Sequence, residues 1–143
     1  MAREPLSSSA AVLAGVSASV TGEFRRQGQD ALNAIRLWAE HVERAGGIAL
    51  GEGGPRRPLR LIVLDDASRT ERAKDNILRL LDDEHVDLLL GPYSSRLTLA
   101  AARVTEARGK VLWNHGGSSD VIWSSGYRRV ISVPSPEIGR AHV

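Results

Sequence analysis

The sequence predicts an α/β fold: a parallel sheet of about five strands with helices on both faces. Short apolar runs alternate along the chain with longer segments whose apolar residues recur every three or four positions. The runs are typical of strands, and the longer segments have the period of amphipathic helices. The connections between them are short and rich in Gly, Pro, Ser and Asp. Such alternation is typical of βαβ units, which build parallel sheets.

The expected elements can be placed by residue range. Strands are predicted at 11–19, 59–64, 86–90, 110–113 and 129–133. Helices are predicted at 30–45, from about 70 to 84 and from about 95 to 108, with one helical turn at 121–124. Within the first helix an apolar stripe is expected to face the sheet, made of Ala31, Ile35, Trp38, Val42 and Ala45. Ser68 or Thr70 is expected to cap the second helix, and 51–58 to form an exposed loop.

Composition narrows the class of protein. The chain has 143 residues, of which 42% are hydrophobic and 25% charged, as in an ordinary soluble domain with a core. The formal net charge is +2 and bases alternate with acids, so no nucleic-acid partner is expected. The absence of cysteine excludes disulfides, thiolate metal sites and a cysteine nucleophile. No apolar run reaches the roughly 18 residues of a membrane span, so no direct membrane insertion is expected. Neither a cofactor nor a metal is expected.

Three loops are the expected ligand-binding region. In a parallel α/β sheet, ligands bind at the carboxyl ends of the strands, near the point where the strand order reverses. The loops that leave the first, third and fourth predicted strands are 21–28, 91–96 and 114–120. All three consist of small polar residues on an apolar framework, so the sequence predicts a polar site at this edge.

These loops belong to a series of motifs that stand in the order found in a known family. They are Gly15–Gly22, Gly46-Gly47-Ile48, Leu61–Asp66, Leu89–Ser95, Asn114–Ser119, Gly126-Tyr127-Arg128 and Val133-Pro134-Ser135. Over about residues 12–136 the chain resembles the N-terminal part of the type I periplasmic binding proteins, in the leucine/isoleucine/valine branch of ABC transporter substrate-binding proteins.

The resemblance implies a binding protein and not an enzyme. Such a protein holds a branched-chain or other amino acid, or an amide-like solute, in a cleft between two lobes and presents it to ABC permease subunits. It implies a periplasmic or extracellular location and a monomer at full length, although the start of the chain does not make a convincing export signal. Residues 12–136 would then be an incomplete first lobe and 1–11 an N-terminal extension. Residues 137–143 are interpreted as a non-native tail, because they read like the translation of a sequencing adapter.

The resemblance also implies roles for individual residues. Ser95 would bind the ligand carboxylate through its hydroxyl and backbone N–H, and the Gly116 carbonyl would face the ligand ammonium. Ser118 would add a hydroxyl. The remaining candidate ligand-binding residues are Tyr93, Ser94, Gly117 and His115. Without the family, Ser95 is better explained as a helix N-cap and Ser118 as a loop residue, and His115 is expected to face solvent.

Two positions depart from the pattern of the family. Gln27 stands before Gly28, the residue expected to open the first helix, where relatives often carry an aromatic side chain. His115 is bulkier than the residues common at its position. Both departures leave the identity of the ligand open.

The sequence permits other functional interpretations. A same-fold ligand sensor in a regulator or receptor is the main alternative. A serine hydrolase would need Ser95, His115 and Asp66 or Asp120 to meet, but Gly-x-Ser-x-Gly is absent around Ser95. A phosphoacceptor receiver domain needs its acidic pair after the first strand, whereas Asp65-Asp66 follow the second. There they are expected to cap the following turn and to hold the loop. The Gly51–Gly54 segment precedes a strand, so it does not form a phosphate cradle.

Overall fold

The computed structural model describes residues 10–135 of the chain. The predicted tail, 137–143, and most of the predicted N-terminal extension, 1–11, lie outside the described residues. The strands of the main sheet are β1 (Val12–Ala18), β4 (Leu59–Asp65), β5 (Leu88–Leu90), β6 (Leu112–Asn114) and β7 (Val130–Ser132). The helices are α1 (Arg25–Arg44), α2 (Thr70–Asp82), α3 (Ser95–Ala107) and α4 (Asp120–Ser124).

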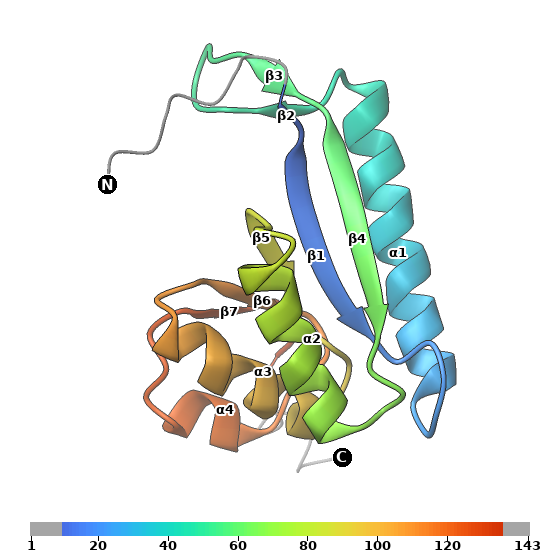
Figure 1. Ribbon diagram of the computed structural model, residues 1–143, viewed down its shortest axis with the longest axis vertical. Helices are drawn as coiled ribbons and strands as arrows, with labels where there is room; N and C mark the ends of the chain where they lie inside the picture. The colour runs from blue at the N-terminus through green and yellow to red at the C-terminus, as the bar shows by residue number, and fades with distance from the viewer. Residues whose placement is uncertain (1–9, 136–143) are drawn as a thin grey trace.

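The main sheet has five strands in the order β4-β1-β5-β6-β7, and every neighbouring pair is parallel. This confirms the predicted fold class. The chain moves from β1 outward to β4, then returns across β1 to β5, so the strand order reverses between β1 and β5. Figure 1 shows β1 and β4 side by side with their carboxyl ends at the bottom. The loops at this reversal are therefore the expected place for a ligand.

Helices cover both faces of the sheet, as predicted. On one face α1 packs on β4 and β1, around the buried residues Val12, Ala14 and Leu59. On the other face α2 and α3 enclose a larger core, formed by Ile77, Leu80, Val86, Leu89, Ala101, Ala102 and Leu112. Burial of each large aliphatic side chain there stabilises the fold by about 1.5–3 kcal/mol.

Helix α1 begins at Arg25, five residues before the predicted start. Gly28, expected to open the helix, instead lies within its first turns and is buried. A Cβ atom at Gly28 would lie 2.2 Å from the carbonyl oxygen of Ser19. The helix can therefore pass this close to the end of β1 only because position 28 has no side chain. Charged residues at 25–26 hid the true start, because no apolar residue marks the first turn.

The predicted apolar stripe of α1 faces the sheet only in part. Leu32 is buried, whereas Trp38 is 38% exposed and Ala45 is exposed. Trp38 lines an apolar hollow of about 720 Å³. Its other lining residues are Ala31, Ala34, Ile35, Leu88, Leu90, Trp113, Asn114, His115 and Val133. Helix α1 covers β4 and β1, so the part of this face formed by β5 and β6 is not covered by it.

Two local predictions were wrong. The segment 51–58 is not only a loop, because β3 (Arg56–Arg57) pairs with β2 (Ile48–Ala49) in a short antiparallel ladder. Strands of two residues carry no detectable period in the sequence. Neither Ser68 nor Thr70 caps α2, whose N-cap is Arg69 without a side-chain hydrogen bond. Ser68 has φ +59° and contacts other loops instead.

Candidate functional site

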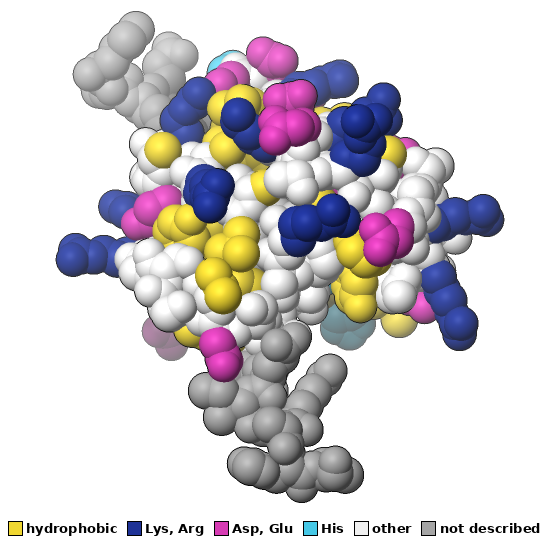
Figure 2. Space-filling view, turned by 90° about the horizontal axis from the view of Figure 1, so that it is seen from below, with side chains coloured by type: hydrophobic (Ala, Val, Ile, Leu, Met, Phe, Trp, Pro, Cys, Tyr) yellow, Lys and Arg dark blue, Asp and Glu magenta, His cyan; other side chains and the backbone are white. Residues whose placement is uncertain are grey.

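The candidate site lies where the loops after β1, β4, β5 and β6 meet at the carboxyl edge of the sheet. Figure 2 views the molecule from below, and so faces this edge. Polar surface covers much of the view, with basic and acidic side chains spread over it. Both predicted loops that follow β5 and β6 reach this edge, together with the loop that follows β1.

The acidic pair after β4 fixes the loops to one another, as predicted. Asp66 is buried and accepts hydrogen bonds from the hydroxyls of Ser17 (3.1 Å) and Ser19 (2.6 Å). Asp65 accepts from the Thr21 hydroxyl at 2.6 Å and from the amides of Val20, Thr21 and Ala67. Burial raises the pKa of Asp65, but these hydrogen bonds outweigh burial and hold the pKa below its ordinary value. Both carboxylates are thus turned toward the protein.

The loop between β5 and α3 ends in a residue with an unusual backbone. Ser94 is the N-cap of α3, with φ +79°, and its Oγ accepts from the amide of Leu97 at 3.3 Å. Such a conformation costs a non-glycine residue of the order of 1–3 kcal/mol. Thr98 offsets part of that cost, because its hydroxyl donates to the Ser94 carbonyl at 2.7 Å. Ser95 is therefore the first helical residue of α3 and not its N-cap.

Ser95 joins the two loops that were expected to share the ligand. Its Oγ accepts hydrogen bonds from the backbone amides of Ser118, at 3.1 Å, and Ser119, at 3.0 Å. A serine oxygen has two acceptor lone pairs and one proton to donate. Both lone pairs are used, and no acceptor for the Ser95 proton is found among residues 10–135. The structure thus brings Ser95 and Ser118 together and leaves Ser95 able to act as a donor.

The loop after β6 is shaped by Asn114, which the sequence analysis did not single out. Its buried side chain bonds to Gly116, Gly117 and Ser132. Gly116 also forms an isolated parallel bridge with Tyr93, and a Cβ at Gly116 would lie 2.8 Å from the Tyr93 Cα. Gly117 is buried, and a Cβ there would lie 2.6 Å from the Ile122 Cδ1. Both glycines are therefore required by close packing.

His115 is partly buried, whereas it was expected to face solvent. It lies beside Val16, Ala31 and Tyr93, between the end of β1 and α1. Burial lowers the pKa of His115 below its ordinary value, and hydrogen bonds with the backbone of Gly91 and of His115 itself offset only part of this. The shift favours the neutral form of the imidazole. The loop after β6 thus carries this ring toward α1.

Sequence reasoning missed an aromatic and basic cluster at the same edge. The rings of Phe24 and Tyr93 meet edge to face, with centroids 5.6 Å apart. The guanidinium of Arg96 lies 5.5 Å from the centroid of the Phe24 ring. Arg96 also approaches Glu23 at 3.5 Å and the carbonyl of Ser68 at 3.4 Å. A lone Phe in a polar loop and an Arg in a first helical turn gave no pattern that would have singled them out.

The geometry does not assemble a hydrolytic triad. Ser95 Oγ is bonded to amides, Asp66 to serine hydroxyls, and His115 to backbone, and no hydrogen bond joins any two of these side chains within residues 10–135. Asp120 is exposed at the start of α4. In the same range, no three His, Cys, Asp or Glu side chains are grouped so that they could hold a metal ion. The arrangement can bind and orient a polar molecule, but it offers no activated nucleophile.

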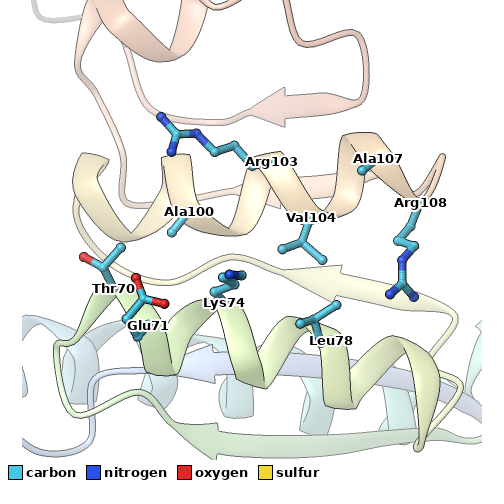
Figure 3. A pocket seen from close by; sticks show the side chains of 9 residues that line it. All are labelled: Thr70, Glu71, Lys74, Leu78, Ala100, Arg103, Val104, Ala107 and Arg108. Atoms are coloured by element: carbon cyan, nitrogen blue, oxygen red, sulfur yellow. The ribbon is translucent and has the colours of Figure 1, made fainter.

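A second hollow lies on the helical layer, away from these loops. It is a groove of about 380 Å³ between α2 and α3, which run side by side in the same direction (Figure 3). Leu78 and Val104 project into the groove, and the side chains of Lys74 and Arg103 lie beside it. None of the candidate ligand residues lines this groove. In the part of the chain that is described, no helix is both long and apolar enough to cross a membrane.

The fold and the loops together form a parallel α/β sheet whose strand ends carry hydroxyl and amide groups at the reversal of strand order. Comparison with known proteins agrees. Residues 12–136 match the family described as periplasmic binding protein, and the chain belongs to that family. The proteins of this family are solute-binding proteins and not enzymes.

Solved structures share the fold at low sequence identity. The chain is similar to the branched-chain amino acid transporter substrate binding protein LivJ from Streptococcus pneumoniae in complex with isoleucine, with 20% identity and a TM-score of 0.80. That match covers 90% of this chain and 35% of LivJ. A solute-binding protein from R. palustris in complex with benzoate gives 21% identity and a TM-score of 0.76, with 92% of this chain and 35% of the other covered. The chain thus spans about a third of the length of these proteins.

Proposed function

We propose that this chain forms the carboxylate-gripping part of the extracytoplasmic substrate-binding component of an ABC importer. The structures similar to it include one with bound isoleucine and one with bound benzoate. The two ligands differ in shape, and only isoleucine carries an ammonium group, but both carry a carboxylate. The proposed ligand is therefore a small organic acid, with amino acids as the first class to test.

The observation that carries this proposal is the hydrogen bonding of Ser95. Because the amides of Ser118 and Ser119 occupy its acceptor sites, its hydroxyl can serve a ligand only as a donor. Ser95 also opens α3, a helix of 13 residues, where unpaired backbone N–H groups and the helix dipole favour a negative charge. Hydroxyl and helix both select the same group, a carboxylate.

The other candidate residues take supporting parts in the proposal. Tyr93 would form the wall of the site between the loops after β1 and β6, since it contacts Phe24 and pairs with Gly116. Gly116 and Ser118 would offer polar groups to the amino end of the ligand. Ser94, Gly117 and His115 would hold the two loops in shape, because their hydrogen bonds and packing are directed toward the protein.

At full length, the proposed protein would have two lobes that close over the ligand, and a permease would recognise the closed form. The chain spans 35% of LivJ, so the groups that select the ligand side chain would come largely from the rest of the protein. We propose that the full-length protein works as a monomer outside the cytoplasm. Co-purification with permease subunits would favour import, and binding without such partners would favour the alternative of a ligand sensor.

The proposal is tested by calorimetric titration of the full-length protein with L-isoleucine and with benzoate. Binding of either acid in the micromolar range is expected, and Ser95→Ala should weaken it at least about tenfold, or about 1.4 kcal/mol. Ser124→Ala is the matched control, because Ser124 is exposed on α4 and its hydroxyl donates to the Val121 carbonyl of the same helix. Unchanged affinity in the folded Ser95→Ala variant would refute the proposed role of this hydroxyl.

A further inference from the structure

We propose that Arg96 provides a second anion-binding position in the same site, so that the preferred ligand carries two acidic groups. This inference rests on the proposed function and narrows its class of ligand. It starts from the aromatic and basic cluster formed by Phe24, Tyr93 and Arg96. That cluster reaches the loops after β1 and β4, whereas Ser95 reaches the loop after β6.

The guanidinium of Arg96 has few polar partners. Its side chain is 56% exposed, and both of its polar contacts are long and use one nitrogen, Nη2. The partners are the Glu23 carboxylate at 3.5 Å and the Ser68 carbonyl at 3.4 Å. No acceptor for Nε or Nη1 occurs among residues 10–135. The planar guanidinium of Arg96 therefore keeps N–H donors that can bind both oxygens of a carboxylate.

Phe24 fixes where this guanidinium lies. The Phe24 ring supports Arg96 on its face, 5.5 Å from the centroid, and contacts Tyr93 at its edge. The backbone amide of Phe24 donates to the Ser68 hydroxyl at 2.9 Å, so the ring is tied to the loop after β4. Arg96 is thus oriented by an aromatic surface and need not be ordered by the ligand, which lowers the entropic cost of binding.

The acidic side chains nearby do not cancel this charge. Asp65 and Asp66 spend their oxygens on hydroxyls and amides of the loops. Glu23 is the acidic partner of Arg96, but its side chain is 71% exposed and the pair is solvated. Exposed pairs of this kind contribute little, so a ligand carboxylate can replace Glu23. The first carboxylate would lie at Ser95 and the second at Arg96, with Tyr93 between them.

The test compares ligands that differ by one acidic group. The full-length protein is titrated with two matched pairs, L-glutamine against L-glutamate and benzoate against terephthalate. In at least one pair the diacid should bind about tenfold or more tightly than the monoacid. Arg96→Gln should abolish that preference while monoacid affinity changes less than about twofold. Arg103→Gln, an exposed arginine on the same helix, is the control and should leave both affinities unchanged.

Each other result contradicts the inference in a distinct way. Equal binding of monoacids and diacids would overturn the second position while leaving the proposed function standing. Equal weakening of both ligands by Arg96→Gln would make Arg96 a residue that positions the loops and nothing more. Absence of binding for all four acids would overturn this inference and the proposed function together. Arg96→Lys, which keeps the charge but loses the fork, should retain only part of the preference.

Discussion

Asn114 holds Gly117 by both of its backbone groups. Its Oδ1 accepts the Gly117 amide at 2.8 Å, and its Nδ2 donates to the Gly117 carbonyl, also at 2.8 Å. Oδ1 accepts the Gly116 amide as well, at 3.2 Å, and Nδ2 bonds to Ser132 on β7 at 2.9 Å. The buried Asn114 side chain at the end of β6 therefore makes the hydrogen bonds to the loop backbone that a neighbouring strand would otherwise make.

Replacement of Asn114 by alanine should destabilise the protein by about 2–4 kcal/mol, because several buried polar groups lose their partners at once. Asn114→Asp keeps the acceptor for the two amides, but its ionised carboxylate has no donor. It should be less harmful than alanine, above all at low pH, where the protonated carboxyl can donate. Urea denaturation of the purified protein measures both. Asn33→Ala, on the exposed side of α1, serves as the control, with a change below about 0.5 kcal/mol. A cost for Asn114→Ala no larger than that control would contradict this account of the loop.

Gly28→Ala should lower stability, although alanine is the better helix former. In an unconstrained helix this change would stabilise by about 1 kcal/mol. Here the added Cβ would lie 2.2 Å from the Ser19 carbonyl, so α1 must move away from the end of β1 at a cost of about 1–3 kcal/mol. The sign of the change in the unfolding free energy is the decisive result. A gain in stability would show that α1 does not approach β1 so closely.

Asp65→Asn should reduce stability at neutral pH and bring a smaller penalty in acid. The pKa of Asp65 is lowered in the folded protein, so its ionised form stabilises the fold above the pKa of the unfolded chain. That contribution is lost as the pH falls through the folded-state pKa. Thermal unfolding from pH 7 to pH 3 measures the difference between wild type and variant. Asp30→Asn, exposed on α1, is the control, and a penalty for Asp65→Asn that stayed constant with pH would argue against an ionic contribution.

His115 should make the protein less stable as the pH falls below about 6.5, the ordinary pKa of histidine. Its pKa is lowered in the folded state, so the unfolded state binds the proton more readily and gains population in mild acid. His115→Asn should flatten the loss of stability between pH 7 and pH 5. His85→Asn is a suitable control, because His85 is exposed and its φ of +51° is one that asparagine tolerates. Identical pH profiles for wild type and His115→Asn would contradict the burial of this ring.

The sequence was sufficient to predict the parallel sheet, since β4 and β5 come from nearly continuous apolar runs such as Leu59–Leu64. Such runs follow directly from burial on both faces. It was also sufficient to predict that Asp65 and Asp66 hold loops and that Ser95 and Ser118 lie together. The start of α1 could not be predicted, because its first turn is set by contact of Gly28 with Ser19, which lies nine residues away at the end of another element.

The parts of the site that were missed depend on side chains meeting across loops. Nothing in the local sequence of Phe24, Ser68 or Arg96 indicates that they touch, because each follows a different strand. Asn114 was included only as the start of a loop, although its amide organises that loop. Tertiary hydrogen bonds of this kind leave no periodic signal. Only the folded structure shows that the loops after β1, β4 and β5 form one surface.

Strand β1 pairs with β4 on one side and with β5 on the other, with Val16 opposite both Val63 and Leu90. A slip of one residue in this interior strand would turn Ser17 and Ser19 away from Asp66 and release the neighbouring loops on both sides. The distances between the side chains of these loops are thus set by the pairing of β1 with both neighbouring strands. One loop therefore cannot shift without the others. Proteins that share this sheet should therefore differ in ligand preference through side-chain substitutions at fixed backbone positions, such as 24 and 96.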